Sequence, residues 1–176
     1  MSRGVRIIPP SSVQHVINRG NRRQGVFRDP EDYEDFICLL GRAADQAPVR
    51  LLAYCLMPNH WHLVLWPTTS RALSAYMHWL TSTHVRHLHH RRGTTGEGHI
   101  YQERYRNVTV GNDGQFLTLC RYVEANARTA GLVGQAEDWP YSSLSRPMTL
   151  DGRCLLTPGP VRRPENWLAL VNGVQP

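Results

Sequence analysis

The sequence predicts an α+β protein with the ferredoxin-like order β-α-β-β-α-β, in which helices cover one face of an antiparallel sheet and an extra helix follows. Two observations predict this fold. Short β-branched or apolar runs alternate with longer segments of helical periodicity, and two of the apolar runs are separated by only a short turn. The length of 176 residues suits a single domain with a substantial core.

The predicted elements follow one another with short connections. In chain order they are a strand over 13–19, a helix that starts at Pro30 and ends before Pro48, strands over 49–56 and 60–66, a helix over 71–90, a strand over 104–110 and a helix over 113–131. The first and third strands are central neighbours in the ferredoxin-like order. His15 is therefore expected on a strand adjacent to the one that carries His60 and His62.

Local signals justify the first four elements. β-branched residues mark the first strand. Asp29 caps the first helix, and Pro30 suits its first position, where no backbone N–H is needed. Pro48 ends the helical pattern. The turn at 57–59 then joins two apolar runs, which predicts an antiparallel hairpin.

The later elements rest on helical spacing and on changes of composition. Apolar residues recur at helical spacing through 71–90, and the end of this helix is basic over 86–92. Two explanations of that basic end stay open: the cations complement the helix dipole, or they contact phosphate. Small residues over 93–98 predict a loop. Asp113 or Gly114 opens the last long helix.

The composition changes again after residue 145. We expect one folded domain over 1–145 and a Pro- and Gly-rich extension over 146–176, with one short helix at 167–171. Residues 1–6 lack the apolar segment of a secretory signal. No apolar run approaches a membrane span of about 20 residues. A cytoplasmic protein without a membrane partner is the expectation.

Charge and cysteine content narrow the classes of partner. The formal net charge is +6, and all 20 basic residues are Arg. Guanidinium groups suit phosphate recognition, although codon bias in a GC-rich genome is the simpler explanation for the missing Lys. Net basicity favours a polyanionic partner.

The scattered Cys38, Cys55, Cys120 and Cys154 predict neither disulfides nor a zinc site, and we expect Cys38 and Cys55 to be buried thiols.

Two histidines flank a tryptophan in the third predicted strand. Side chains alternate between the faces of a strand, so His60 and His62 project from one face and Trp61 from the other. Trp61 is expected in the core. Two imidazoles held side by side on a rigid surface suit a metal ion, but such pairs are also found in purely structural roles. The pair alone does not decide between metal binding and a structural role.

A second constellation lies on the last long helix. Tyr122 and Asn126 are four residues apart and therefore share a face, whereas Glu124 points elsewhere. Tyr122 could supply a nucleophile that forms a covalent phosphotyrosine. A divalent ion on His60 and His62, completed by the Asn126 amide oxygen, would polarise a phosphate. This donor set suits Mg²⁺ or Mn²⁺. Together the residues predict phosphodiester transesterification.

Three stretches resemble the single-tyrosine HUH transposases: 16–23, 53–62 and 121–126. The most similar subgroup is the REP-associated tyrosine transposases, and the similarity runs in matching order through roughly residues 12–146. The long motif that ends at His62 is far more specific than two histidines alone. The chain departs from the family pattern at Ala127, where members have Pro, and at Tyr101, where members have Trp.

The resemblance implies a ferredoxin-like nuclease that cleaves single-stranded DNA beside a hairpin and rejoins strands. The family's metal-binding histidines map onto His60 and His62, its nucleophile onto Tyr122 and its third ligand onto Asn126. A 5′-phosphotyrosine would form and a 3′-OH would leave, with Mg²⁺ or Mn²⁺ as cofactor and no ATP. The implied process is DNA transposition or the processing of REP elements.

Five arginines are predicted to bind DNA. They follow the first strand or lie in the fourth: Arg19, Arg22, Arg23, Arg104 and Arg106. A solvated turn is an equally good explanation for the first three. Tyr105 either stacks on a base or, as we favour, faces the core. Glu103 could act as a base or lie near a metal, but we assign it no role.

Two other functions and two oligomeric states remain open from the sequence. A domesticated relative would bind DNA hairpins without cleaving them, and a replication-initiator or relaxase-type nickase would share the histidine pair. Retention of His60, His62, Tyr122 and Asn126 argues against a pure binding protein. A homodimer that exchanges helices through the loop at 93–98 and a monomer are both compatible with the sequence.

Overall fold

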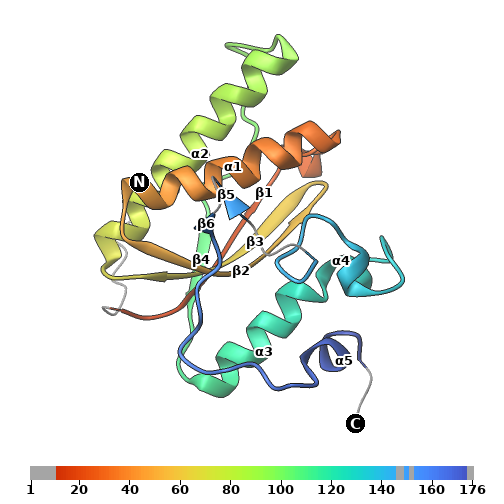
Figure 1. Ribbon diagram of the computed structural model, residues 1–176. Helices are drawn as coiled ribbons and strands as arrows, with labels where there is room; N and C mark the ends of the chain where they lie inside the picture. The colour runs from red at the N-terminus through yellow and green to blue at the C-terminus, as the bar shows by residue number, and fades with distance from the viewer. Residues whose placement is uncertain (1–10, 146–148, 151–152, 174–176) are drawn as a thin grey trace.

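The computed structural model describes residues 11–145, 149–150 and 153–173 (Figure 1). Four strands, three longer helices and several short elements make up this part of the chain. In order they are β1 (Gln14–Arg19), η1 (Asn21–Arg23), α1 (Pro30–Gln46), β2 (Val49–Met57), β3 (His60–Pro67), α2 (Ser70–Arg92), β4 (Arg106–Thr109), α3 (Asp113–Glu124), α4 (Asn126–Thr129), η2 (Ala136–Asp138), β5 (Thr149–Leu150), β6 (Arg153–Cys154) and α5 (Trp167–Val171).

The main sheet has the strand order β2-β3-β1-β4, and all its neighbouring strands are antiparallel. This confirms the predicted ferredoxin-like α+β fold, with β1 and β3 in the centre. α1 and α2 lie on one face of the sheet, and α3 lies on the other (Figure 1). No helix of the described residues is long and apolar enough to cross a membrane.

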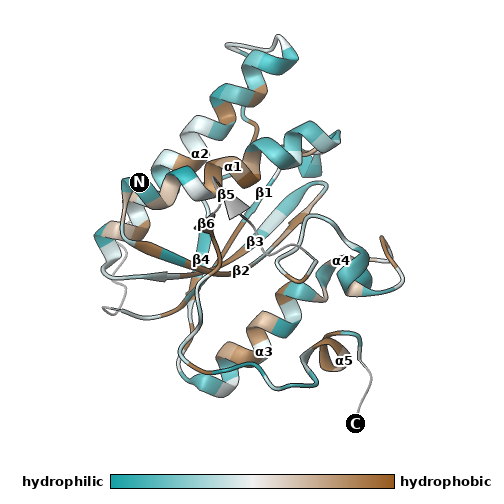
Figure 2. Cartoon of the chain, viewed as in Figure 1, coloured by the Kyte–Doolittle hydropathy of each residue, from teal (hydrophilic) through white to brown (hydrophobic). Residues whose placement is uncertain are grey.

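The sheet separates two hydrophobic cores. One lies under α1 and α2 and includes Trp61, Leu63 and Leu65 from β3. The other lies under α3 and includes Val64 from the same strand. Strand alternation therefore sends neighbouring residues of β3 into opposite cores. Figure 2 shows hydrophobic stretches within the strands, whereas the helices carry mixed faces.

Trp61 is fully buried, as predicted, and its indole is held by a polar chain. The indole Nε1 donates a hydrogen bond of 2.9 Å to the Tyr101 hydroxyl. That hydroxyl lies 2.7 Å from Nδ1 of His84, which is also fully buried. Buried aromatic residues with polar ends need such partners. Tyr101 thus has a defined place between β3 and α2.

α1 begins as predicted. The Asp29 side chain accepts a hydrogen bond of 2.9 Å from the Asp32 backbone N–H. Asp32 is itself buried and forms ion pairs with Arg91 and Arg92 at the end of α2. Arg92 also donates to the Val26 carbonyl at 2.7 Å. These contacts join the start of α1 to the end of α2 and give the two arginines a structural role.

Three sequence expectations need correction. The helix predicted over 113–131 is two helices, α3 and α4, with Ala125 between them at ψ −6°. β4 starts at Arg106 rather than at residue 104, so Arg104 precedes the strand. Cys38 is exposed because it lies on the solvent side of α1, although Cys55 is buried as expected. An amphipathic helix buries one face only, and the apolar neighbours of Cys38 face inward.

The C-terminal segment packs on the sheet and on α3. The backbone N–H of Thr157 donates to the Leu51 carbonyl at 2.9 Å, and Arg163 donates to the Leu52 carbonyl at 3.2 Å. α5 forms where the short helix is predicted, with Trp167 and Val171 buried. The segment therefore contributes to the core under α3.

The buried His84 predicts a pH-dependent stability. Burial, reinforced by the charges of Arg92 and His87, lowers the pKa of His84 to about 3, from 6.5 in an unfolded chain. Between these values the unfolded chain takes up a proton that the native protein does not, so stability falls as the pH drops below about 6.5. We expect urea unfolding of His84→Gln to show a smaller loss between pH 6.5 and 4 than wild type.

The matched control is His99→Gln, which removes an exposed histidine. His15 and His62 titrate in the same window and remain in both proteins, so the difference between the two profiles reports on His84 alone. Identical profiles for wild type and His84→Gln would contradict the prediction.

Candidate active site

The histidine pair lies at the start of β3, on the face that α3 covers in part. Antiparallel register sets His60 opposite Arg19 and His62 opposite Ile17 on β1. The two imidazole centroids are 5.0 Å apart, and the ring planes meet at 78°. His62 is buried at 4% exposure, and Trp61 between the two anchors the strand from the opposite core. The predicted side-by-side arrangement is present.

Tyr122 reaches this pair from the last turn of α3. Its ring centroid is 5.6 Å from that of His62, edge-on at 86°. The side chain is 52% exposed. The phenol therefore lies against a buried imidazole while remaining open to solvent and to a large substrate.

Asn126 completes the group. It is the first residue of α4, and its side chain hydrogen-bonds to the His60 imidazole. The break at Ala125 keeps right-handed backbone angles, so Asn126 still lies one turn after Tyr122 on the same side. The structure thus brings together His60, His62, Tyr122 and Asn126, which are far apart in the sequence.

The His60 ring is oriented by its neighbour Asn59. His60 Nδ1 lies 2.7 Å from the Asn59 Oδ1 atom, which can only accept a hydrogen bond, so Nδ1 carries the proton. The Asn59 amide is fixed in turn, because its Nδ2 donates to the Arg23 carbonyl at 3.4 Å. In the neutral ring this leaves the lone pair on Nε2. Sequence reasoning assigned no role to Asn59.

His15 contacts the second histidine. Its Nε2 lies 3.0 Å from Nδ1 of His62, and the two ring planes differ by 18°. His15 also lies edge-on to Tyr122, with 6.1 Å between ring centroids. The sequence placed His15 on the adjacent strand without giving it a function. The sequence signal that could have indicated this contact is the two-residue spacing of His15, Ile17 and Arg19. In a strand this spacing puts all three side chains on one face, which is the face of the histidine pair.

Burial keeps these imidazoles neutral. It lowers the pKa of His62 to about 3, with the charges of His60, His15 and Arg19 adding to the effect. Burial likewise lowers the pKa of His15 to about 4. The pKa of His60 is lowered by burial and by Arg19, whereas its hydrogen bond to Asn126 acts in the opposite direction. Neutral imidazole is the form that binds metal ions.

The two histidines fit a divalent ion only when the Asn126 amide is included as a third ligand. Within 11–145, 149–150 and 153–173, no group of three or more His, Cys, Asp or Glu side chains could hold a metal. His60 and His62 supply two neutral imidazoles, and Asn126, in contact with His60, supplies an amide oxygen. Nitrogen and oxygen donors of this kind leave positions for phosphate oxygens and water, as Mg²⁺ or Mn²⁺ requires.

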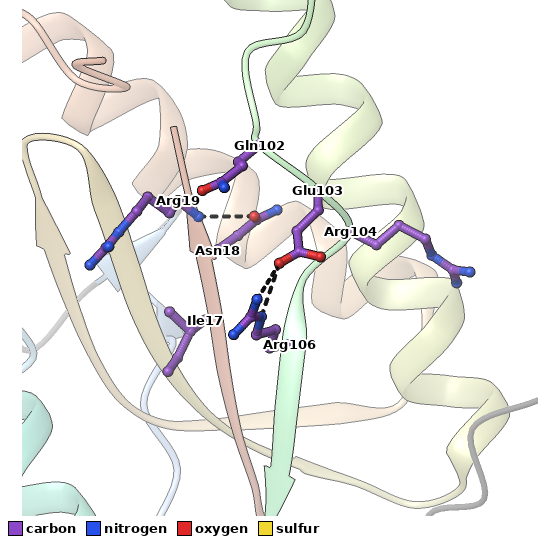
Figure 3. A pocket seen from close by; sticks show the side chains of 7 residues that line it. All are labelled: Ile17, Asn18, Arg19, Gln102, Glu103, Arg104 and Arg106. Atoms are coloured by element: carbon purple, nitrogen blue, oxygen red, sulfur yellow. Dashed lines mark hydrogen bonds and ion pairs between the residues drawn. The ribbon is translucent and has the colours of Figure 1, made fainter. Parts of the chain in front are cut away.

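A small pocket lies between β1 and the segment that leads into β4 (Figure 3). Its volume is about 250 Å³, and it is lined by Ile17, Asn18, Arg19, Gln102, Glu103, Arg104 and Arg106. Arg106 is paired with Ile17 across the strands, so it lies on the face of the histidine pair. Arg106 Nε donates to Glu103 at 3.0 Å, and Arg104 extends away from that pair (Figure 3).

The other predicted DNA-binding arginines, Arg22 and Arg23, lie in η1, next to the histidine pair. Both are exposed and have positive φ angles of 50° and 61°. The Arg23 carbonyl holds the Asn59 amide that orients His60. Tyr105 faces the core, as favoured from the sequence.

Glu124 anchors the helix that carries Tyr122. It is fully buried and points away from Tyr122 and Asn126, as predicted. Its carboxylate accepts hydrogen bonds from Ser143 Oγ at 2.7 Å and Trp167 Nε1 at 2.7 Å, and it pairs with Arg163 at 2.9 Å. The C-terminal segment is thereby attached to α3 only two residues after Tyr122, the nucleophile candidate. Sequence reasoning missed this role, because none of the partners lies nearby in the chain.

The comparisons with known proteins identify the family of this chain and support its fold. The sequence pattern of the IS200-like transposases matches residues 11–126, about two thirds of the chain. The chain therefore belongs to the IS200-like transposase family. No curated protein sequence gives a match.

One of three similar solved structures supports the fold. A REP-associated tyrosine transposase bound to a REP hairpin is 18% identical, with a TM-score of 0.68, and the match covers 94% of this chain and 96% of that one. A candidate transposase from Deinococcus radiodurans is 21% identical over 70% of this chain and 96% of its own, with a TM-score of 0.49. The Saccharomyces cerevisiae tRNA(His) guanylyltransferase is 10% identical, with a TM-score of 0.49 and coverages of 74% and 64%.

The buried Glu124 network predicts a measurable loss of stability on neutralisation. Glu124→Gln removes the charge that Arg163 and two neutral donors share, and hydrogen bonds to charged groups contribute about 1.5–3 kcal/mol each. We expect the free energy of unfolding in urea to fall by about 2–3 kcal/mol. The exposed Glu97→Gln is the matched control and should cost little. Equal stabilities of the two variants would contradict a role for Glu124 as an anchor.

Proposed function

We propose that this transposase-family protein is a metal-dependent endonuclease and strand transferase that acts on single-stranded DNA beside hairpins. The observation that carries the proposal is the position of Tyr122. Its exposed phenol lies against His62, on the same side of the helix as Asn126, which contacts His60. Membership of the IS200-like transposase family supports the same reaction class.

In the proposed reaction the Tyr122 hydroxyl oxygen attacks a backbone phosphorus atom. A P–O bond to Tyr122 forms, the bond from phosphorus to the 3′ oxygen breaks, and the phenol loses a proton while the departing 3′ oxygen gains one. The product is a 5′-phosphotyrosine and a free 3′-OH. Because the new bond is also a phosphate ester, another 3′-OH can reverse the step and join strands without ATP.

The remaining site residues orient the phosphate. His60 and His62, each with its Nδ1 engaged by a neighbour, present Nε2, and Asn126 presents its amide. Mg²⁺ or Mn²⁺ bound there would polarise the scissile phosphate and neutralise developing charge. Arg19, opposite His60 in the sheet register, adds a fixed positive charge beside the site.

A basic path for the DNA strand leads away from the histidine pair. Arg22 and Arg23 lie at the end of β1, and Arg19, Arg104 and Arg106 line the pocket toward β4. Guanidinium groups bind phosphate oxygens with paired donors. The similar transposase is bound to a REP hairpin, which supports a DNA hairpin as the partner of this chain as well.

The proposal extends to organisation and location. We assign the nuclease to residues 1–145 and regard 146–176 as an extension; Arg163 and Trp167, within it, hold the nucleophile helix through Glu124. Processing of DNA places the protein in the cytoplasm of a bacterial cell. A monomer can form the site, because all its proposed residues come from one chain, and a homodimer is compatible with it.

The nucleophile assignment predicts loss of a covalent adduct. Wild-type protein mixed with hairpin-bearing single-stranded DNA and Mn²⁺ should form an adduct that survives denaturing electrophoresis, whereas Tyr122→Phe should form none, because it lacks the attacking oxygen. The matched control is Tyr141→Phe, whose ring stacks on Tyr33 in the other core and should not affect the adduct.

An adduct from Tyr122→Phe equal to that of wild type would contradict the assignment. A footprint on the hairpin without cleavage under any divalent ion would instead identify a DNA-hairpin binding protein. Supercoiled plasmid in a parallel reaction separates a hairpin-specific enzyme from a replication-type nickase.

The basic path predicts a change in salt dependence. Each phosphate contact on single-stranded DNA contributes about −0.7 to the slope of log affinity against log salt. Replacing both Arg22 and Arg23 with Gln should weaken hairpin binding and flatten this slope by about one unit, as measured by fluorescence anisotropy. Arg42→Gln, an exposed change of α1 on the opposite face, is the control with unchanged binding. An unchanged slope in the double variant would remove these arginines from the path.

A further inference from the structure

His15 is a third imidazole in the site that the proposed reaction does not use. It comes from β1, whereas His60 and His62 come from β3, and its Nε2 lies 3.0 Å from Nδ1 of His62. The nearly parallel ring planes suit a hydrogen bond in the plane of both rings. His15 also contacts the Tyr122 ring at its edge. One side chain therefore touches both a proposed ligand and the proposed nucleophile.

A hydrogen bond between two neutral imidazoles has a direction. Only one of the two facing nitrogens carries the proton, and the other accepts it. If His62 Nδ1 donates, then His62 Nε2 has a lone pair and can bind a metal ion. If His15 Nε2 donates instead, His62 Nε2 carries the proton and cannot. The pair of histidines thus decides whether His62 is a ligand.

The neighbouring histidine has the same arrangement with a different partner. His60 Nδ1 donates to the Asn59 amide oxygen, and this bond leaves its Nε2 free to act as a ligand. An acceptor at Nδ1 of a metal-binding histidine fixes both the tautomer and the ring orientation. His15 stands in the corresponding position for His62.

We propose that His15 is a positioning residue that accepts the Nδ1 proton of His62 and so prepares Nε2 of His62 to bind the divalent ion. The ligand role of His62 rests on the proposed function, but the position of its proton does not. The arrangement also packs His15 against Tyr122, so one residue aligns the ligand and the nucleophile.

The first test measures the tautomer in metal-free, full-length protein. Long-range proton–nitrogen NMR spectra of the ¹⁵N-labelled chain distinguish a protonated from an unprotonated ring nitrogen, and His62→Gln identifies the His62 signals. In wild type we expect the His62 proton on Nδ1. In His15→Leu, which has no acceptor, we expect the proton to shift to Nε2, the site that free histidine prefers. His15→Gln, whose amide oxygen can accept, should keep it on Nδ1.

The second test measures Mn²⁺ binding by titration calorimetry. His15→Leu should bind Mn²⁺ about 10–100-fold more weakly than wild type, the usual effect of losing the partner of a ligating histidine. His15→Gln should restore most of the affinity. Adduct formation by His15→Leu should need a higher Mn²⁺ concentration than adduct formation by wild type. The exposed His99→Leu is the control for loss of a histidine.

A His62 proton on Nε2 in wild type would overturn the proposal, and so would unchanged Mn²⁺ affinity in a folded His15→Leu. Failure of the proposed function looks different. In that case the wild-type protein binds no Mn²⁺ and forms no adduct, while the NMR spectra of the metal-free protein still show whether His15 sets the His62 tautomer. Thermal unfolding of each variant verifies that it is folded.

Discussion

The alternation of side chains along β3 is the constraint on which the site depends. Trp61 is fully buried under α1 and α2, and its indole is tied to Tyr101. A shift of one residue in this strand would expose Trp61 and bury both histidines in the wrong core. Hydrophobic burial on one face therefore holds His60 and His62 on the other. The same interaction that stabilises the fold aims the two imidazoles.

The second half of the site depends on how α3 is attached. Tyr122 is half exposed, so its position depends strongly on the buried side of the helix that carries it. Glu124 supplies that attachment through Ser143, Arg163 and Trp167. A carboxylate without these donors would be costly to bury. The C-terminal segment thus takes part in placing the nucleophile candidate, although it lies far from it in sequence.

Neutral imidazoles beside a basic surface give the site its chemical character. Burial lowers the pKa values of His15, His60 and His62, and the nearby Arg19 adds to the effect for His60 and His62. Their lone pairs are therefore available at neutral pH, while positive charge nearby comes from guanidinium groups that stay ionised. The protein thereby separates the groups suited to bind a metal from those suited to bind phosphate.

The sequence by itself determined the order of elements, the central position of β1 and β3, and the shared face of His60 and His62, because these follow from local periodicity and from short connections. It also placed Tyr122 and Asn126 on one helical side, and this holds despite the break at Ala125. Only the tertiary structure decided that His15 meets His62, that Glu124 binds Arg163 and Trp167, and that Arg91 and Arg92 pair with Asp32. Such contacts join residues distant along the chain, and their geometry depends on packing distances that no local pattern encodes.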